Sequence, residues 1–176
     1  MRTKPAAFTL IELLIVVAII GILVTLSIPV ISVLRGRAQR SQCTANLHSL
    51  YVAADLYVQD KGSWPQIRLT SQDESALQDY AKQWIDALRQ FGPAEKTWIC
   101  PTIQSLSGSP DYLDPQNIRS DYFAMPFDDK MVTPHRWPRQ PWFVEVGDIH
   151  GNGNLMVFAD GSVSDLKTVA AGVGRK

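Results

Sequence analysis

The sequence predicts an α+β fold, in which a long amino-terminal helix packs against a small antiparallel sheet with one shorter helix beside it. Three observations support this prediction. An apolar run covers residues 8–34, a helical pattern of apolar residues continues to residue 61, and short strand-like stretches fill the carboxyl-terminal part. The 176 residues suit one membrane segment and one modest domain.

Composition and charge argue against several classes of protein. Basic and acidic side chains both number 17, and a nucleic-acid partner is not expected without a basic excess. The two cysteines are too few for a disulfide scaffold or a four-thiolate metal site. The chain contains no nucleophile elbow, Walker loop or His-Glu-x-x-His zinc motif, so we do not expect an enzyme.

The apolar run of residues 8–34 contains Glu12 as its only ionisable side chain. A helix needs about 20 mostly apolar residues to cross a bilayer, whereas the apolar region of a signal peptide has about 7–15. We therefore expect the segment to stay attached and to anchor the protein in a lipid bilayer. Basic residues lie on both sides, so the positive-inside rule is close to a tie, and the short leader favours a cytoplasmic amino terminus.

Glu12 has two interpretations. In the first, its carboxylate lies near the membrane interface and reaches water. In the second, it meets a positive charge inside the bilayer, because an unpaired charge at mid-membrane costs about 3 kcal/mol.

The string "KPAAFTLIELLIVVAIIGILVTLSIPV" resembles the amino terminus of type IV pilins and of the pseudopilins of type II secretion. The resemblance implies that residues 1–7 are a leader, that a prepilin peptidase cuts between Ala7 and Phe8, and that Phe8 becomes N-methylated. The family usually has glycine at the position of Ala7. It also implies that Glu12 neutralises the terminal amine of a neighbouring subunit. Pro29 matches a helix-kinking proline, in keeping with its missing amide hydrogen.

The same resemblance implies a pilin-like fold and a structural function. The first expectation is a type II secretion pseudopilus subunit that supports protein export. It would be held in the bacterial inner membrane with its amino terminus cytoplasmic and its head extracytoplasmic. The partners would be other pilin or pseudopilin subunits, the prepilin peptidase, and an inner-membrane assembly platform with its ATPase.

Two alternatives to the pseudopilus stay open. One is a type IV pilus subunit for adhesion, motility or DNA uptake. The other is a membrane-anchored binding protein that uses the same processing signal without polymerising. An exposed apolar groove in the head would favour binding, and a head packed closely on the helix would favour a filament subunit.

The helical pattern continues outside the membrane over residues 35–62, because apolar residues recur at i, i+3, i+4 and i+7 up to Val58. Gly62 and Pro65 are expected to end this helix. The globular head then covers residues 63–176.

A second helix is expected over residues 72–90, with Ser71 and Glu74 as a capping box. Irregular loops are expected over residues 104–118, which contain glycine and proline, and over residues 126–141, which contain several prolines. Strands are expected at residues 97–100, 121–125, 142–146, 154–159 and 162–166.

The stretch "HGNGNLMVFADGSVSDL" begins at His150 and resembles the H-x9-DG domain found at the end of many pilin-like proteins. Asp160 and Gly161 predict a hairpin, because glycine accepts the positive φ that a type I′ turn requires. One interpretation has the His150 ring bond the Asp160 side chain. In the other, both are ordinary turn and strand-end residues.

Calcium is a further hypothesis for this region. The stretch from Asp148 to Gly153 partly imitates the start of a calcium loop, but Ala159 stands where the bidentate glutamate would be. Some pseudopilins bind calcium near their carboxyl end, so the resemblance leaves Asp148, Asp160 and Asp165 as candidates. No other cofactor is expected.

Cys43 and Cys100 would both lie outside the membrane in the orientation given above. In an oxidising compartment they could form a disulfide that joins the long helix to the head. Such a bridge would contribute roughly 4 kcal/mol in the chain-entropy model. The alternative is two separate buried thiols.

Overall fold

A computed structural model describes residues 10–107 and 118–173, apart from the side chains at positions 27, 29 and 30. The chain divides into two compact units, residues 1–38 and residues 39–176. We call the second one the head unit.

The long helix α1 covers Leu10–Lys61, as the apolar pattern predicts. It is continuous through Pro29 and ends where the Gly62 N–H donates to the Val58 carbonyl at 2.9 Å. Within the described part of the chain, α1 is the helix that is long and apolar enough to cross a membrane.

The section of α1 in the head unit buries one continuous stripe of side chains. Its fully buried members recur every three or four residues, which is the spacing of one helix face. They are Cys43, Leu47, Leu50, Ala54 and Val58. Each buried leucine contributes about 1.5–3 kcal/mol of transfer free energy, so this face holds α1 firmly within the head unit.

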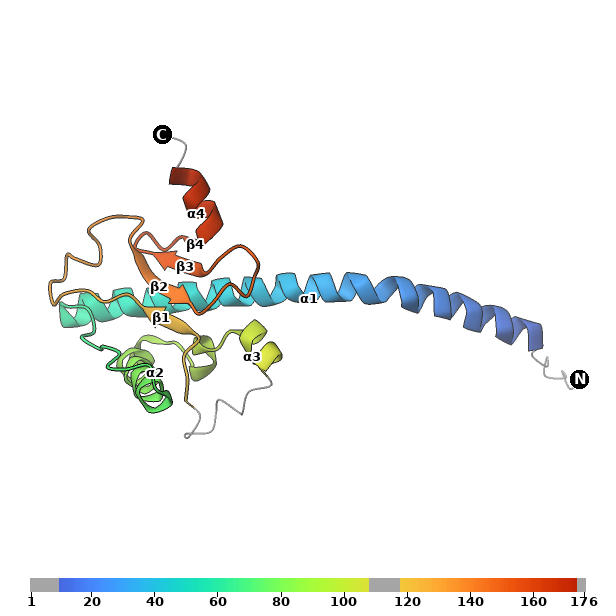
Figure 1. Cartoon of the computed structure of the whole chain (residues 1–176), viewed down its shortest axis with the longest axis horizontal. Coiled ribbons are helices and arrows are strands. Elements are labelled where there is room, and N and C mark those ends of the chain that lie inside the picture. The colour runs from blue at the N-terminus through green and yellow to red at the C-terminus, as the bar shows by residue number, and fades with distance from the viewer. Residues whose placement is uncertain (1–9, 108–117, 174–176) are drawn as a thin grey trace, which may run out of the picture. The chain divides into compact units, whose positions relative to one another are not determined.

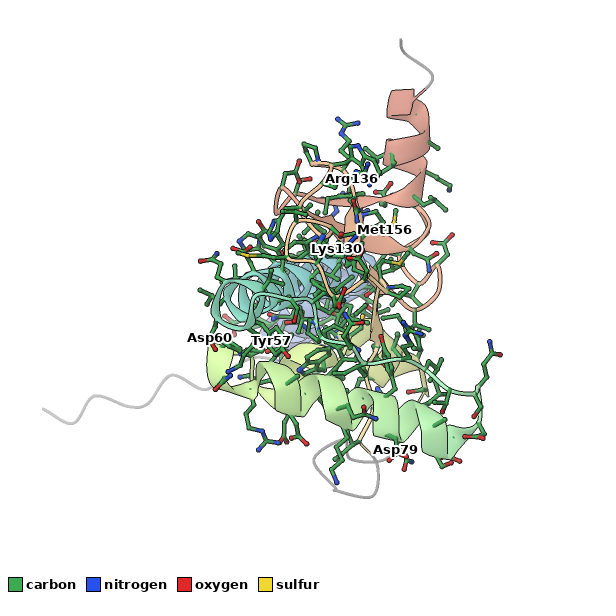
Figure 2. The ribbon with its side chains drawn as sticks, turned by 90° about the vertical axis from the view of Figure 1, so that its left-hand side faces the viewer. Tyr57, Asp60, Asp79, Lys130, Arg136 and Met156 are labelled. Atoms are coloured by element: carbon green, nitrogen blue, oxygen red, sulfur yellow. The ribbon has the colours of Figure 1, made fainter. Side chains whose placement is uncertain are left out.

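The sheet has four strands in the order β1-β2-β3-β4, with every neighbouring pair antiparallel. The strands are β1 (Tyr122–Ala124), β2 (Pro141–Glu145), β3 (Leu155–Phe158) and β4 (Val163–Asp165). Each lies inside or within one residue of a predicted strand, so the α+β, pilin-like fold is confirmed. Figure 1 shows α2 and α4 on opposite sides of the head unit, and Figure 2 shows the same arrangement, with Asp79 on the side of α2 that faces away from α1.

The predicted strand at residues 97–100 is wrong. Thr97 and Trp98 belong to a 3-10 turn, η2 (Glu95–Trp98), which the Ile99 N–H closes by donating to the Lys96 carbonyl. Its apolar residues are buried because they pack into the core, and not because they pair as a strand. The Trp98 ring, for example, is 1% exposed. Pro101 follows directly and starts the short helix α3 (Pro101–Ser107), part of which was expected to be a loop.

The second helix, α2 (Glu74–Leu88), is shorter than predicted and has a different cap. Asp73 is the N-cap, with its carboxylate accepting from the Ala76 N–H at 2.8 Å. Ser71 instead donates to the Asp73 carboxylate at 2.7 Å. A charged carboxylate is a stronger acceptor for the helix N–H groups than a hydroxyl, which explains why the helix begins later.

The 3-10 turn η1 (Arg89–Phe91) follows α2, and α4 (Leu166–Val173), which was not predicted, ends the described chain.

The core of the head unit is aromatic. Trp64 packs against Trp84 and Trp142 with ring centroids 5.7 Å and 5.1 Å away. The Phe143 ring of β2 lies 5.7 Å from Trp84 and 6.2 Å from Trp98. Rings from α2, η2, β2 and the segment after α1 therefore meet in the core of the head unit.

Candidate functional site

The first candidate site is the apolar section of α1. Glu12 lies in its first turn, and Pro29 lies within the helix. Ala7 and Phe8, at the predicted cleavage point, lie outside the described residues, so cleavage and methylation stay predictions.

Large apolar side chains cover the surface of this section. Their exposed fractions are about half or more from Leu10 to Leu34, for example 65% at Ile11 and 66% at Leu26. A continuous apolar surface of this extent is not stable in water and marks a membrane or protein contact. The section is therefore built to lie in lipid or against other helices.

The second candidate region is the carboxyl-terminal hairpin. The Gly161 N–H donates to the Phe158 carbonyl, and Gly161 has φ +77°. Asp160 is not among the described residues with positive φ, so the turn is not type I′. It is a three-residue loop whose last residue is left-handed, the next most common way to join two antiparallel strands.

His150 and Asp160 have different partners. The Asp160 carboxylate accepts from the Ser162 N–H at 2.9 Å, and hydrogen bonds from Ser162 lower the pKa of Asp160. The histidine that reaches this turn is His48, whose Nδ1 lies 3.3 Å from the Gly161 carbonyl oxygen. The interpretation in which His150 bonds Asp160 is therefore not what the geometry gives.

The calcium candidates also have separate local partners. The Asp148 carboxylate accepts from the Gly153 N–H at 2.8 Å. Asp165 accepts from the Thr168 N–H at 2.8 Å and from the Arg40 guanidinium at 2.6 Å. Among the described residues, Asp148, Asp160 and Asp165 do not come together in one group of metal-ligating side chains.

The structure does bring together Cys43 and Cys100, the two predicted disulfide partners. Both are free, fully buried thiols. They share their position with Glu145 and His150, and one ligand atom from each of these four side chains lies within 4.8 Å of all the others. We call this group the buried thiol cluster. The disulfide itself stays a prediction.

Four separate parts of the head unit position the buried thiol cluster. Cys43 lies on the buried face of α1, and Glu145 is the last residue of β2. The backbone N–H of Cys100 donates to the buried carboxylate of Asp121 at 2.8 Å, which fixes the start of α3. His150 comes from the β2–β3 connection and points its Nε2 atom toward Glu145 at 3.4 Å and Cys100 Sγ at 4.0 Å.

The electrostatics of the cluster are unusual because a carboxylate is buried there without a hydrogen bond. Glu145 is 1% exposed, and neither of its carboxylate oxygens has a hydrogen-bond partner. Burial, with further contributions from Cys100, raises the pKa of Glu145 to about 8. The hydrogen bond from Cys43 lowers the pKa of Cys100 to about 6, and the same bond raises that of Cys43.

Sequence reasoning identified Cys43, Cys100 and His150 for other roles and missed Glu145. A local signal existed, because Glu145 is the single charged residue in the otherwise apolar stretch 141–146. No sequence pattern indicated that these four residues would meet, since they lie far apart in the chain and follow no metal-binding spacing.

Comparison with known proteins finds similarities that begin at the amino terminus. Residues 2–28 match the family model described as the prokaryotic N-terminal methylation motif. The chain is 46% identical over 58 residues to the type IV major pilin protein PilA of Myxococcus xanthus, a match that covers 33% of this chain and 26% of that protein.

A second group of relatives comes from Neisseria gonorrhoeae. The chain is 30% identical over 89 residues to a type IV major pilin protein PilE1, covering 51% of this chain and 49% of the relative. It therefore spans about half of that pilin's length and about a quarter of PilA's. No solved structure matches. Together with the α+β fold and the long apolar helix, these similarities identify the chain as a type IV pilin-like protein.

Proposed function

We propose that this protein is a structural subunit of a type II secretion pseudopilus, held in the inner membrane and polymerised through α1 to support protein export. The observation that carries the proposal is the exposed apolar surface of residues 10–34, with Glu12 as its only ionisable side chain. This section overlaps the methylation motif at residues 2–28. Such a surface can move from lipid into a bundle of identical helices without meeting water.

The chemistry of assembly would depend on cleavage before Phe8. Cutting the Ala7–Phe8 bond creates a cationic amine at the end of an apolar helix. Glu12 of a neighbouring subunit would neutralise that amine, and in a low-dielectric surrounding either charge alone is costly. The pair therefore selects neighbours with the correct stagger. The partners in this scheme are a prepilin peptidase, an assembly platform and its ATPase, with the head unit extracytoplasmic.

The packing of the head unit supports a filament subunit over a binding protein. The stripe of α1 from Cys43 to Val58 is fully buried, so the head is built around the helix that would polymerise. A binding protein would need a recognition groove. One groove of the head unit has about 330 Å³ and a largely apolar lining that includes Leu77, Tyr80 and Phe123.

A type IV pilus subunit is the second candidate. The specific observation in its favour is that the relatives from Myxococcus xanthus and Neisseria gonorrhoeae are both named type IV major pilin proteins. The same helix chemistry serves both kinds of filament. The two functions differ in where the filament ends: at the cell surface for a pilus, in the periplasm for a pseudopilus.

The test of assembly is the substitution Glu12→Ala in a host with an intact filament system. We expect membrane insertion and cleavage to be unchanged and filaments to be lost. The unpaired amine costs about 3 kcal/mol at each interface, which corresponds to about a hundredfold in the association constant. Membrane fractionation, the mass of the mature amino terminus and electron microscopy of filaments measure the three steps.

Glu12→Asp is the matched control, since it keeps the negative charge and should retain part of the assembly. Normal filaments with Glu12→Ala would show that Glu12 has no role in assembly. Filaments that reach the cell surface without any effect of gene deletion on protein export would favour the pilus over the pseudopilus.

A further inference from the structure

The buried thiol cluster has the composition of a metal site. Two sulfur atoms, one imidazole nitrogen and one carboxylate oxygen converge within 4.8 Å of one another. The four side chains come from α1, the start of α3, the end of β2 and the β2–β3 connection, so long-range folding brings them together. No catalytic or assembly role described above uses them.

We propose that Cys43, Cys100, Glu145 and His150 bind one zinc ion, which fastens the head part of α1 to the sheet. This proposal does not depend on the function proposed for the filament. It assigns the cluster a structural role within one chain.

The geometry suits tetrahedral zinc. Zinc binds thiolate sulfur at about 2.3 Å and imidazole nitrogen or carboxylate oxygen at about 2.0–2.2 Å, so ligand atoms around it lie about 3.3–3.8 Å apart. The His150 Nε2 atom is already 3.4 Å from Glu145 Oε1 and 4.0 Å from Cys100 Sγ. Only small side-chain shifts would bring the four ligand atoms to zinc-binding distances.

Charge and burial give an independent reason. The Glu145 side chain is 0% exposed and that of His150 is 5% exposed. The Glu145 carboxylate makes a long ion-pair contact with His150 Nε2 at 3.4 Å and accepts no geometric hydrogen bond, so burying its charge is costly. Two thiolates and a carboxylate would carry three negative charges, and a divalent cation bound among them would remove most of that cost.

Surrounding groups hold the ligands as outer-shell partners do in known metal sites. The backbone N–H of Cys100 donates to the Asp121 carboxylate at 2.8 Å, which fixes the backbone at this ligand. The Glu145 carbonyl accepts from the Asn154 amide at 2.9 Å. These contacts fix the backbone at Cys100 and at the end of β2.

The ligand set selects zinc over calcium. Calcium takes six to eight oxygen ligands, whereas this cluster supplies two sulfurs and one nitrogen. A disulfide between Cys43 and Cys100 would consume both thiolates. The zinc site and the disulfide therefore exclude each other, and one measurement can tell which the protein contains.

The test uses the full-length chain, purified in detergent without chelators. We expect about one zinc per chain by elemental analysis, and a melting temperature that falls by about 5 °C or more when a chelator removes it. Cobalt added to the zinc-free chain should produce the intense visible bands of a tetrahedral site together with a thiolate charge-transfer band.

Glu145→Gln should weaken cobalt and zinc binding by tenfold or more without lowering the melting temperature of the metal-free chain, because it removes a buried charge. Cys43→Ser should remove about half of the charge-transfer intensity. Asp148→Asn is the control, since Asp148 lies two residues from His150 and outside the cluster. It should change neither the metal affinity nor the charge-transfer intensity.

Three results would overturn the proposal. The first is the absence of both bound zinc and any cobalt spectrum in the folded full-length chain. The second is metal binding that survives equally in Glu145→Gln and Cys43→Ser, which would indicate adventitious surface ions. The third is a Cys43–Cys100 disulfide found by non-reducing peptide mapping of protein taken directly from its membrane.

Discussion

Two buried carboxylates of the head unit, Asp165 and Glu145, are in opposite electrostatic situations. Asp165 accepts hydrogen bonds from Thr168 and pairs with Arg40 at 2.6 Å. Thr168, with a smaller contribution from Arg40, lowers the pKa of Asp165. Among the described residues, Glu145 has no backbone or arginine donor, its nearest cationic candidate is His150 at 3.4 Å, and burial raises its pKa to about 8. The first carboxylate stabilises the fold by being ionised, whereas the second would be ionised at neutral pH only with a cation beside it.

The lowered pKa of Asp165 predicts a pH dependence. Its ionised form stabilises the folded chain above the pKa of an unfolded aspartate, near 3.9, and this contribution is lost as the pH falls through the folded-state value. Asp165→Asn should therefore lower the free energy of unfolding by about 0.5–1 kcal/mol at pH 7. The difference from the unmodified chain should shrink as the pH falls below about 3.9 and vanish below the lowered folded-state pKa. Urea unfolding at several pH values measures it.

Asp60→Asn is the matched control for this prediction. Asp60 also has a cationic partner, Lys61 at 2.9 Å, but both side chains are about half exposed. Loss of the Asp60 charge should change the free energy of unfolding little at any pH, because exposed ion pairs contribute little to stability. A constant difference between Asp165→Asn and the unmodified chain from pH 7 to pH 3 would contradict the role given to the Asp165 charge.

At the scale of elements, the β3–β4 turn docks on α1. The Tyr51 hydroxyl donates to the Ala159 carbonyl at 3.2 Å, and His48 contacts Gly161. A Cβ atom on Gly161 would lie 3.0 Å from the Tyr51 ring. The turn therefore needs glycine for two reasons, the left-handed backbone and the close approach of α1.

Gly161→Ala tests this docking. A left-handed alanine costs about 1–2 kcal/mol, and the contact with Tyr51 should add to that cost. Gly151→Ala is the control, because Gly151 has nearly the same φ, +78°, with no atom within 4 Å of the added Cβ. Denaturant unfolding should show a larger loss at Gly161. Equal losses at both positions would mean that the close approach contributes nothing.

At the scale of the whole molecule, the two compact units differ in where their apolar side chains lie, exposed in the first and buried in the second. The buried apolar residues of the described chain all lie between Cys43 and Phe158, inside the head unit. Residues 10–34 contribute none of them and expose their apolar side chains instead. The head unit therefore contains a complete core, and the stability of that core does not require the membrane segment.

A fragment of residues 35–176 should accordingly be soluble without detergent and unfold in one cooperative transition. We expect its melting temperature to agree with that of the full-length chain in detergent to within about 5 °C. Size-exclusion chromatography and circular dichroism measure this. Aggregation of the fragment, or a broad transition without fixed aromatic signals, would show that the head depends on the membrane segment.

Much of this molecule follows from local sequence patterns. The long helix, the four strands of the sheet and the hairpin at Asp160 and Gly161 were all predicted, because each depends on the spacing of neighbouring residues. The apolar section of α1 was predicted in the same way, from the length of its apolar run. These features have a period or a turn residue that acts within a few positions of the chain.

Other features were decided by contacts between distant segments. The residues at 97–100 do not form a strand, because the Trp98 ring enters the core. The buried thiol cluster joins residues as far apart as Cys43 and His150. Periodicity measures how a segment divides between apolar and polar surroundings. Which side chains meet inside the core depends on how the segments pack, and that is settled only when the tertiary structure forms.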